Sequence, residues 1–300
     1  MRRVVSVSLG SSHRDHTARL TLLGEEFELQ RVGADGDAAK AAAIIRELDG
    51  QVDCIGLGGM DRYLVAGSRR WEIRQVGRLA RQATRTPVVD GGGYKRYIEP
   101  YLFRQLHEQG IVNFTGKRVL LCAAVDRFGV APLLPELGAE VCYGDLVFAL
   151  GLPIGIRRYG TIRLLARLLL PGLAWLPMSA LYPTGEKQRE ADSRFAHFYQ
   201  WAEIIAGDFH FVRRHLPQDI KGKVVITNTT TAKDVDTFRE RGAAMMVTTT
   251  PEVQGRSFAT NVNEGVLVTL AGKHPDEMTG EDYLNVYCAL GWGARVVDFT

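Results

Sequence analysis

The chain has 300 residues, of which 46% are hydrophobic and 24% charged, so it can form a globular protein with one or two large cores. Its 37 basic and 34 acidic residues are well mixed and leave a formal net charge of +3, which excludes the strongly basic groove of a nucleic-acid-binding protein. The four cysteines form no Cys-x-x-Cys pair and the histidines form no metal-site pattern. We therefore expect reduced thiols, no bound metal and a cytoplasmic location.

The N-terminal third repeats an apolar run that ends in a glycine-rich loop. Runs at 4–9, 52–57 and 87–89 predict strands, and a hairpin at 18–32 and a helix at 37–48 lie between the first two. This alternation predicts a parallel or mixed sheet covered by helices. Ligands of such sheets bind at the carboxyl ends of the strands, where these glycine loops fall.

The third loop, 90–96, is the predicted reacting end of a site. Its three glycines would let a ligand approach the backbone, and Lys95 with Asp90 or Asp61 would form a proton-transfer pair. Substrate contacts are expected from Gly58, Gly59 and Tyr94. The alternative is a surface loop with a solvated lysine. A helix over 97–109 would then lead to the second domain.

The segment 117–145 predicts the start of a Rossmann-like domain, because it reads as strand, tight turn, helix and strand. An acid, Asp145, follows the second strand at the place where a ribose is usually held. The turn lacks the G-x-G-x-x-G pattern, so the sequence does not decide whether the ligand is a dinucleotide, S-adenosylmethionine or another adenosine-bearing molecule. The other residues predicted to contact this ligand are Asp126, Arg127, Phe128, Gly129 and Gly144.

The apolar stretch 146–182 contains four arginines and three prolines, so it is too interrupted to predict a membrane span. It predicts one amphipathic helix over 161–170, buried in the protein or in a homodimer interface. A role at a membrane surface or in a substrate channel is the alternative.

Two later strands end in threonine-rich loops, which predict contacts to a nucleotide or, alternatively, simple helix caps. The residues concerned are Asn228, Thr229, Thr230, Thr249 and Thr250. The polar segment 251–261 predicts a functional loop. Contacts to an anionic substrate are expected from Lys187, Arg256 and Asn261. The last helix, 280–290, is expected to pack back across the domain junction.

The segments GDLVFALGLP (144–153), YPTGEKQ (182–188) and TTPEVQGRSF (249–258) resemble a bacterial family labelled quinate 5-dehydrogenase. The resemblance extends over the whole chain and implies a cofactor, NAD or NADP, and a cyclic hydroxy acid such as quinate or shikimate as the substrate. In architecture the chain is also similar to the pyridinol methyltransferase of iron-hydrogenase cofactor assembly, which implies S-adenosylmethionine.

Together these patterns predict an α/β protein of two domains, an N-terminal α/β domain over 1–114 and a C-terminal Rossmann-like, doubly wound domain over 115–300. The leading hypothesis is a nicotinamide-dependent oxidoreductase with a small-molecule substrate. A methyltransferase using the same crevice and a nucleotide-binding protein without catalysis are the alternatives.

Overall fold

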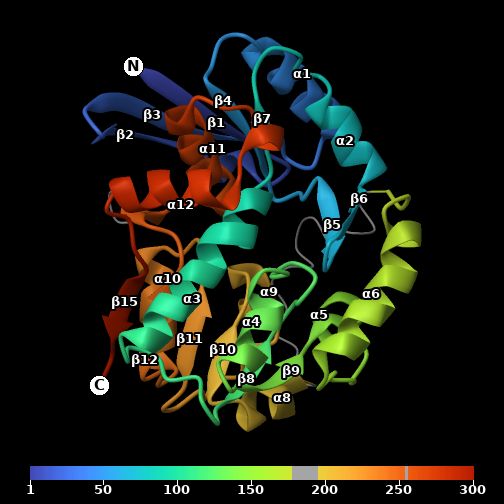
Figure 1. The fold of residues 1–300 in the computed structure, drawn as a ribbon, viewed down its shortest axis with the longest axis vertical. Helices are drawn as coiled ribbons and strands as arrows, with labels where there is room; N and C mark the ends of the chain where they lie inside the picture. Colours follow the sequence, from blue (N-terminus) through green and yellow to red (C-terminus); the bar gives the residue numbers. More distant parts are fainter. Residues whose placement is uncertain (178–194, 254–255) are drawn as a thin grey trace.

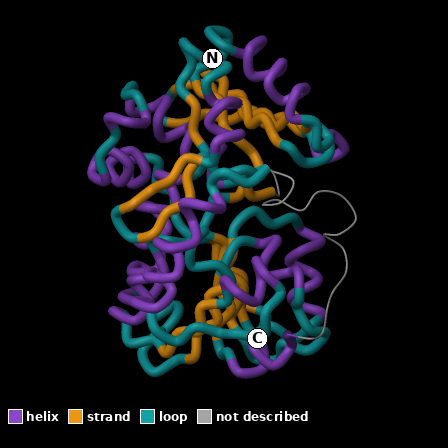
Figure 2. Tube along the Cα trace, turned by 90° about the vertical axis from the view of Figure 1, so that its right-hand side faces the viewer, coloured by secondary structure: helices purple, strands orange, loops and turns teal. Residues whose placement is uncertain are grey.

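The computed structural model describes residues 1–177, 195–253 and 256–300, and it has the predicted α/β architecture with two parallel-rich sheets. The sheets lie toward opposite ends of the long axis, with α3 (Glu99–Glu108) running between them (Figures 1 and 2). Lys187 lies outside the described residues, and only the backbone of Arg256 is described.

The first sheet has the strand order β2-β3-β1-β4-β7, and only β2 is antiparallel to its neighbour. Its strands are β1 (Arg2–Ser8), β2 (His16–Leu22), β3 (Glu25–Gly33), β4 (Cys54–Gly58) and β7 (Val88–Val89). Helices α1 (Ala38–Leu48) and α2 (Arg74–Ala80) bury their apolar sides on one face of this sheet. Asp37 starts α1 because its carboxylate accepts hydrogen bonds from two amides of the first turn.

The other face of the first sheet is covered by helices from the end of the chain, α11 (Thr260–Ala271) and α12 (Gly280–Ala289) (Figure 1). The predicted functional loop 251–261 is corrected here, since a short hairpin of β13 (Glu252–Val253) and β14 (Arg256–Ser257) precedes a helix that begins at Thr260. Residues 260–268 are all buried. The C-terminal range 115–300 therefore contains two helices that complete the first domain, and α12 packs back as predicted.

The second sheet has the strand order β15-β12-β11-β10-β8-β9, with β15 antiparallel and the rest parallel. Its strands are β8 (Arg118–Leu121), β9 (Glu140–Tyr143), β10 (Ile204–Ala206), β11 (Val224–Thr227), β12 (Met245–Thr248) and β15 (Arg295–Asp298). The five parallel strands have the order 2-1-3-4-5, which puts the topological switch point between β8 and β10. Side chains from this sheet form two cores, one on each face.

Helices of the second domain are α4 (Val130–Glu136), α5 (Asp145–Leu150), α6 (Tyr159–Leu173), α8 (Ala196–Trp201), α9 (Phe209–Arg214) and α10 (Ala232–Glu240). The inner side of α6 packs on a hairpin of the first domain, β5 (Tyr63–Ala66) and β6 (Arg69–Glu72), which the sequence analysis did not predict. Within the described ranges, no helix has the length and apolar character needed to cross a membrane.

Candidate active site

A cleft of about 2450 Å³ lies between the two sheets, and both sheets direct the carboxyl ends of their strands into it. The first domain contributes the loops after β1, β4 and β7, and the second contributes those after β8, β9, β10 and β11. This is the position at which open α/β sheets bind ligands.

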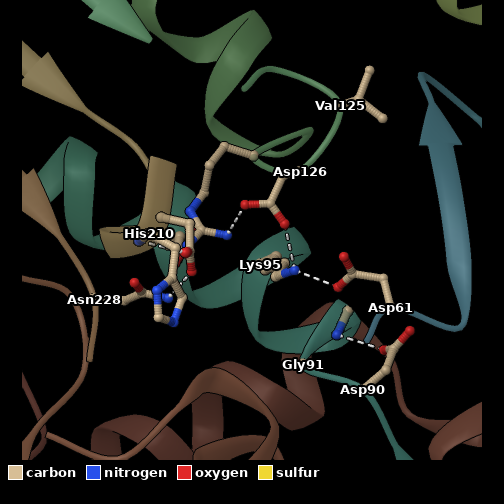
Figure 3. Close-up of polar contacts among 12 residues, drawn as sticks. Asp61, Asp90, Gly91, Lys95, Val125, Asp126, His210 and Asn228 are labelled. Atoms are coloured by element: carbon tan, nitrogen blue, oxygen red, sulfur yellow. Dashed lines mark hydrogen bonds and ion pairs between the residues drawn. The ribbon is translucent and has the colours of Figure 1, made fainter. Parts of the chain in front are cut away.

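Lys95 lies at the junction of the domains and connects them through two carboxylates. Its Nζ donates to Asp61 Oδ1 at 2.5 Å and to Asp126 Oδ1 at 2.6 Å, and all three side chains line the cleft (Figure 3). The expected loop at 90–96 is corrected, because Lys95 lies on a π-helical turn, η2 (Tyr94–Ile98), that continues into α3. A helical turn between two packed domains fixes the ammonium group more firmly than a surface loop would.

The surroundings of Lys95 and Asp61 shift the pKa of both side chains. Burial disfavours the charged ammonium, but the carboxylates of Asp126 and Asp61 outweigh it and raise the pKa of Lys95 well above its usual value. Burial raises the pKa of Asp61 to about 6, with Lys95 opposing this shift and the Asp126 and Asp90 carboxylates adding to it. Lys95 therefore stays protonated at neutral pH, and the pKa of Asp61 lies closer to neutrality than that of an ordinary aspartate.

Asp90, the other predicted partner of Lys95, has a structural role. Its two oxygens accept hydrogen bonds from the backbone amides of Arg62 at 2.6 Å and Gly92 at 2.8 Å. It lines the cleft beside Asp61. Through these two hydrogen bonds it connects the segment that carries Asp61 to the start of η2.

The glycine loop 91–93 is contacted by a side chain of the protein itself, which corrects the expectation that a ligand approaches its backbone. Glu264 of α11 accepts the amides of Gly91 at 2.6 Å and Gly93 at 2.9 Å, and also the Tyr283 hydroxyl at 2.8 Å. A Cβ atom at Gly93 would clash with Tyr283 and Glu264, and Gly91 has a φ of +92°. Burial and the nearby Asp90 carboxylate raise the pKa of Glu264 to about 7.

Arg127 is sealed beneath the cleft and is paired with three carboxylates. Its guanidinium contacts Asp126 at 2.7 Å, and Glu99 and Asp208 at 3.3 Å each. Glu99 is fully buried and Arg127 is only 4% exposed. Asp208, which follows β10, has its pKa lowered to about 2, because Arg127 and His210 together outweigh burial. It accepts the Asn228 amide at 3.0 Å, so the loops after β10 and β11 are joined at the switch point.

The turn after β8 does not fit a pyrophosphate. The two Asp145 oxygens accept the amides of Ala124 at 3.0 Å and Val125 at 2.9 Å, so both the amides and the acid expected to hold a dinucleotide bind one another. Gly129, at the start of α4, packs against the Lys95 carbonyl oxygen. Burial raises the pKa of Asp145 to about 6 against these two hydrogen bonds.

Several residues predicted to contact a ligand are held inside the protein instead. The Tyr94 hydroxyl donates to the Thr249 carbonyl at 2.7 Å, and Thr250 accepts the amide of Thr229. Gly144 packs against the Phe148 ring. The described residues that line the cleft do not include Tyr94, Arg127, Gly129, Gly144, Thr249 or Thr250.

Other predicted residues do line the cleft. They are Gly58, Gly59, Phe128, Asn228, Thr229, Thr230 and Asn261. Asn261 donates to the Ser6 hydroxyl at 2.7 Å and belongs to the packing of α11 on the first sheet. Thr231 caps α10 through a capping box with Asp234, as the alternative interpretation of the threonine loops predicted.

The sequence analysis missed Asp208, His210 and Glu264, each of which lines the cleft. Asp208 could have been found, because it follows the apolar run 204–206 after one glycine, as Asp145 follows the run that ends at Tyr143. Glu264 gives no such signal, since its importance depends on a helix that returns from the far end of the chain.

Comparison with protein families gives one assignment. A model described as a domain of unknown function (DUF8754) matches residues 93–299, and another (DUF8753) matches residues 3–90. The first covers more than half of the chain, so the chain belongs to that family. A search of curated proteins gives no match.

Solved structures with a similar fold include proteins of different functions. A putative malic enzyme (malate oxidoreductase) has 14% identity and a TM-score of 0.38 over 98% of this chain and 85% of its own. The substrate-binding protein of a sugar ABC transport system from Bordetella parapertussis 12822 has 13% identity and a TM-score of 0.40, covering 99% and 89%. L-Tryptophan dehydrogenase from Nostoc punctiforme has 11% identity and a TM-score of 0.39, covering 96% and 80%.

Proposed function

We propose that the protein is an enzyme that transfers a proton to or from an oxygen atom of a hydroxylated small acid in the cleft. The observation behind this proposal is the position of Lys95, whose ammonium lies between Asp61 and Asp126 at the meeting point of the two domains. A protonated lysine held this way can donate to an alkoxide or a carbonyl oxygen. Asp61, with a pKa of about 6, can then restore the proton from solvent.

The polar groups of the cleft suit a ligand with several hydroxyls and a carboxylate. Asp61, Asp208 and the Asn228 side chain can accept or donate hydrogen bonds to hydroxyl groups. Arginines at the cleft, among them Arg62 and Arg96, can bind a carboxylate. Quinate and shikimate have these groups, and the resemblance to quinate 5-dehydrogenases supports this substrate class.

The finer proposal is a nicotinamide-dependent oxidoreductase, because oxidation of a hydroxyl-bearing carbon needs a hydride acceptor such as NAD or NADP. The turn after β8 does not fit the pyrophosphate of such a cofactor, and no step is assigned to it. The Asp145 contacts count equally against a methyltransferase, the alternative, because the same acid was expected to hold the ribose of S-adenosylmethionine. A cytoplasmic homodimer remains part of the proposal.

The test compares wild-type protein with Lys95→Met and Lys95→Arg. Quinate and shikimate would be incubated with NAD or NADP, and reduced nicotinamide would be followed by absorbance. Both variants should lower the rate by about 100- to 10,000-fold, because general acid–base assistance is typically of that size. Lys95→Arg keeps the positive charge between the two carboxylates but cannot exchange a proton at neutral pH.

Two results would contradict the proposal. A wild-type rate in Lys95→Arg would show that charge, rather than proton transfer, is what the site needs. Tight binding of quinate or shikimate without turnover under any cofactor would favour a binding protein that has no catalytic function.

A further inference from the structure

One wall of the cleft is apolar over its whole length. It is formed by the helices that follow β9, namely α5 and the arginine-containing α6, and its side chains come from both. The residues that define this apolar wall are Leu146, Leu150, Ile162, Leu165, Leu169 and Leu173. Leu150 is 54% exposed and Leu169 is 47% exposed, and both line the cleft.

The apolar wall begins where the charged groups end. Val125 and Leu146 also line the cleft, and each is next in sequence to a carboxylate of the site, Asp126 and Asp145. Leu64 and Val65 of β5 line it from the first domain, because α6 packs on that hairpin. The cleft is therefore lined by charged groups at Lys95 and by apolar side chains along α6.

The cleft is also larger than a small hydroxy acid requires. Pockets for drug-sized ligands are typically about 300–1,000 Å³, whereas this cleft has about 2450 Å³. Exposed leucines cost free energy in the ligand-free protein, and a ligand that covers them recovers it. A compact polar ligand at Lys95 would leave the apolar wall uncovered.

We propose that the substrate is amphiphilic, with its hydroxy-acid head at Lys95 and Asp61 and a hydrocarbon tail along the apolar wall of α5 and α6. The position of the head rests on the proposed function, while the position of the tail rests on the wall alone. Quinate and shikimate would then represent only the head of the natural ligand.

A chain-length series tests the tail. Dissociation constants for 2-hydroxybutanoate, 2-hydroxyoctanoate and 2-hydroxydodecanoate would be measured by calorimetry, below the concentrations at which these acids form micelles. Affinity should rise by up to about fourfold for each methylene that the wall covers. Equal affinities across the series would overturn the inference.

Variants on the two sides of α6 supply a matched control. Leu165→Gln and Leu169→Gln change the apolar wall, whereas Leu164→Gln and Leu168→Gln make the same change at positions that are 59% and 69% exposed and outside the cleft lining. The first pair should weaken binding of 2-hydroxydodecanoate at least tenfold and leave 2-hydroxybutanoate unchanged. The second pair should bind both acids as the wild type does.

Thermal unfolding of all four variants would show that the fold is kept, and Leu169→Gln is the safer of the first pair because its side chain is half exposed. Equal weakening by changes on both sides of α6 would contradict the position of the tail. Lys95→Met separates the two proposals, since it should abolish turnover and keep the chain-length trend. If affinity rises with chain length but the wild type turns over no substrate, only the proposed function is contradicted. If the wild type turns over quinate but affinity does not change with chain length, only the amphiphilic substrate is contradicted.

Discussion

Lys95 and Arg127 are cations held in similar ways on opposite sides of Asp126, yet they face different surroundings. One Asp126 oxygen binds Lys95 at 2.6 Å (Figure 3). The other binds Arg127 at 2.7 Å. Lys95 opens into the cleft, where its second partner, Asp61, has a side chain that is 28% exposed. Arg127 is closed off from it, with the fully buried Glu99 as a further partner.

This difference in solvent access shows how one group of charges can contribute to both stability and chemistry. A buried carboxylate needs its cation, because an unpaired charge in a low-dielectric interior is strongly destabilising. A carboxylate at a water-filled cleft can be solvated when its partner leaves. We therefore expect Arg127 to contribute mainly to stability and Lys95 mainly to activity.

The largest expected effect is the loss of stability in Arg127→Met. This change leaves Glu99 buried without a cation, and breaking such a pair costs about 3–5 kcal/mol. The measurement is the urea midpoint, with Arg239→Met as control, because Arg239 forms an exposed pair with Asp236 that should contribute less than about 1 kcal/mol. Equal urea midpoints for the two variants would show that the buried ion pairs of Arg127 contribute no more to stability than the exposed pair of Arg239.

Glu264 is a third buried group, a carboxylate that is held by two amides and a hydroxyl and forms no ion pair with any described residue. Its folded pKa of about 7 is raised above the usual 4.5. The folded state thus binds more protons than the unfolded state between these values, and stability should fall as pH rises from about 4.5 to 7.

The size of this fall is on the order of 3–4 kcal/mol, since each unit of pKa difference corresponds to about 1.4 kcal/mol. Urea unfolding at several pH values would measure it, and Glu264→Gln should flatten the profile. Asp61 and Asp145 change stability in the same direction, so the variant should keep a smaller slope. An unchanged profile would show that Glu264 does not titrate in this range.

Asp126→Asn should affect both properties, because Asp126 is the partner that the two cations share. Loss of one charge from two charge-assisted hydrogen bonds should cost about 1.5–3 kcal/mol in stability. Turnover should also fall, since Lys95 would lose the charge-assisted hydrogen bond to Asp126 that holds its ammonium in place. Asp236→Asn is the matched surface control. A loss of only one property would show that Asp126 serves only one of the cations.

The smallest expected effect is that of Lys95→Met on stability. Lys95 is itself buried, but its partners Asp61 and Asp126 have side chains that are 28% and 14% exposed and can be solvated from the cleft, so the loss should be smaller than in Arg127→Met, which leaves the fully buried Glu99 without a cation. The same urea experiment measures it. A loss as large as that of Arg127→Met would mean that Lys95 is a structural cation and would weaken its assignment as a proton donor.

Most of the fold could be predicted because its strands are apolar runs that end at glycine, aspartate or threonine, as at 54–58 and 224–227. Helix α11 could not, since Asn261, Asn263 and Glu264 look like surface residues in the sequence. They are buried because each finds a partner: Ser6 for Asn261, backbone carbonyls for Asn263, and the Gly91–Gly93 amides for Glu264. A sequence shows residue types, whereas burial of polar groups depends on partners distant in the chain.

The candidate site could be predicted where it depends on local order. The sequence predicts Asp90 or Asp61 as the partner of Lys95, and the structure places Asp61 at 2.5 Å from it; a role in proton transfer stays a prediction. Asp126 was expected to contact a cofactor and instead binds Lys95, a contact across two domains. The β8 turn lacks the glycines of a dinucleotide-binding loop, and the amides of Ala124 and Val125 in this turn donate to Asp145, a contact that the sequence did not predict.

The return of α11 to the first sheet has a consequence for synthesis of the chain. When the ribosome has made residues 1–114, β1 and β4 still lack the helix that covers one of their faces, because that helix begins at residue 260. Apolar surface of the first sheet therefore stays open until nearly the whole second domain has been translated, which is a state prone to aggregation. Folding of the first domain should be completed only after release of the C-terminal residues, so the two halves cannot mature in the order in which they are made.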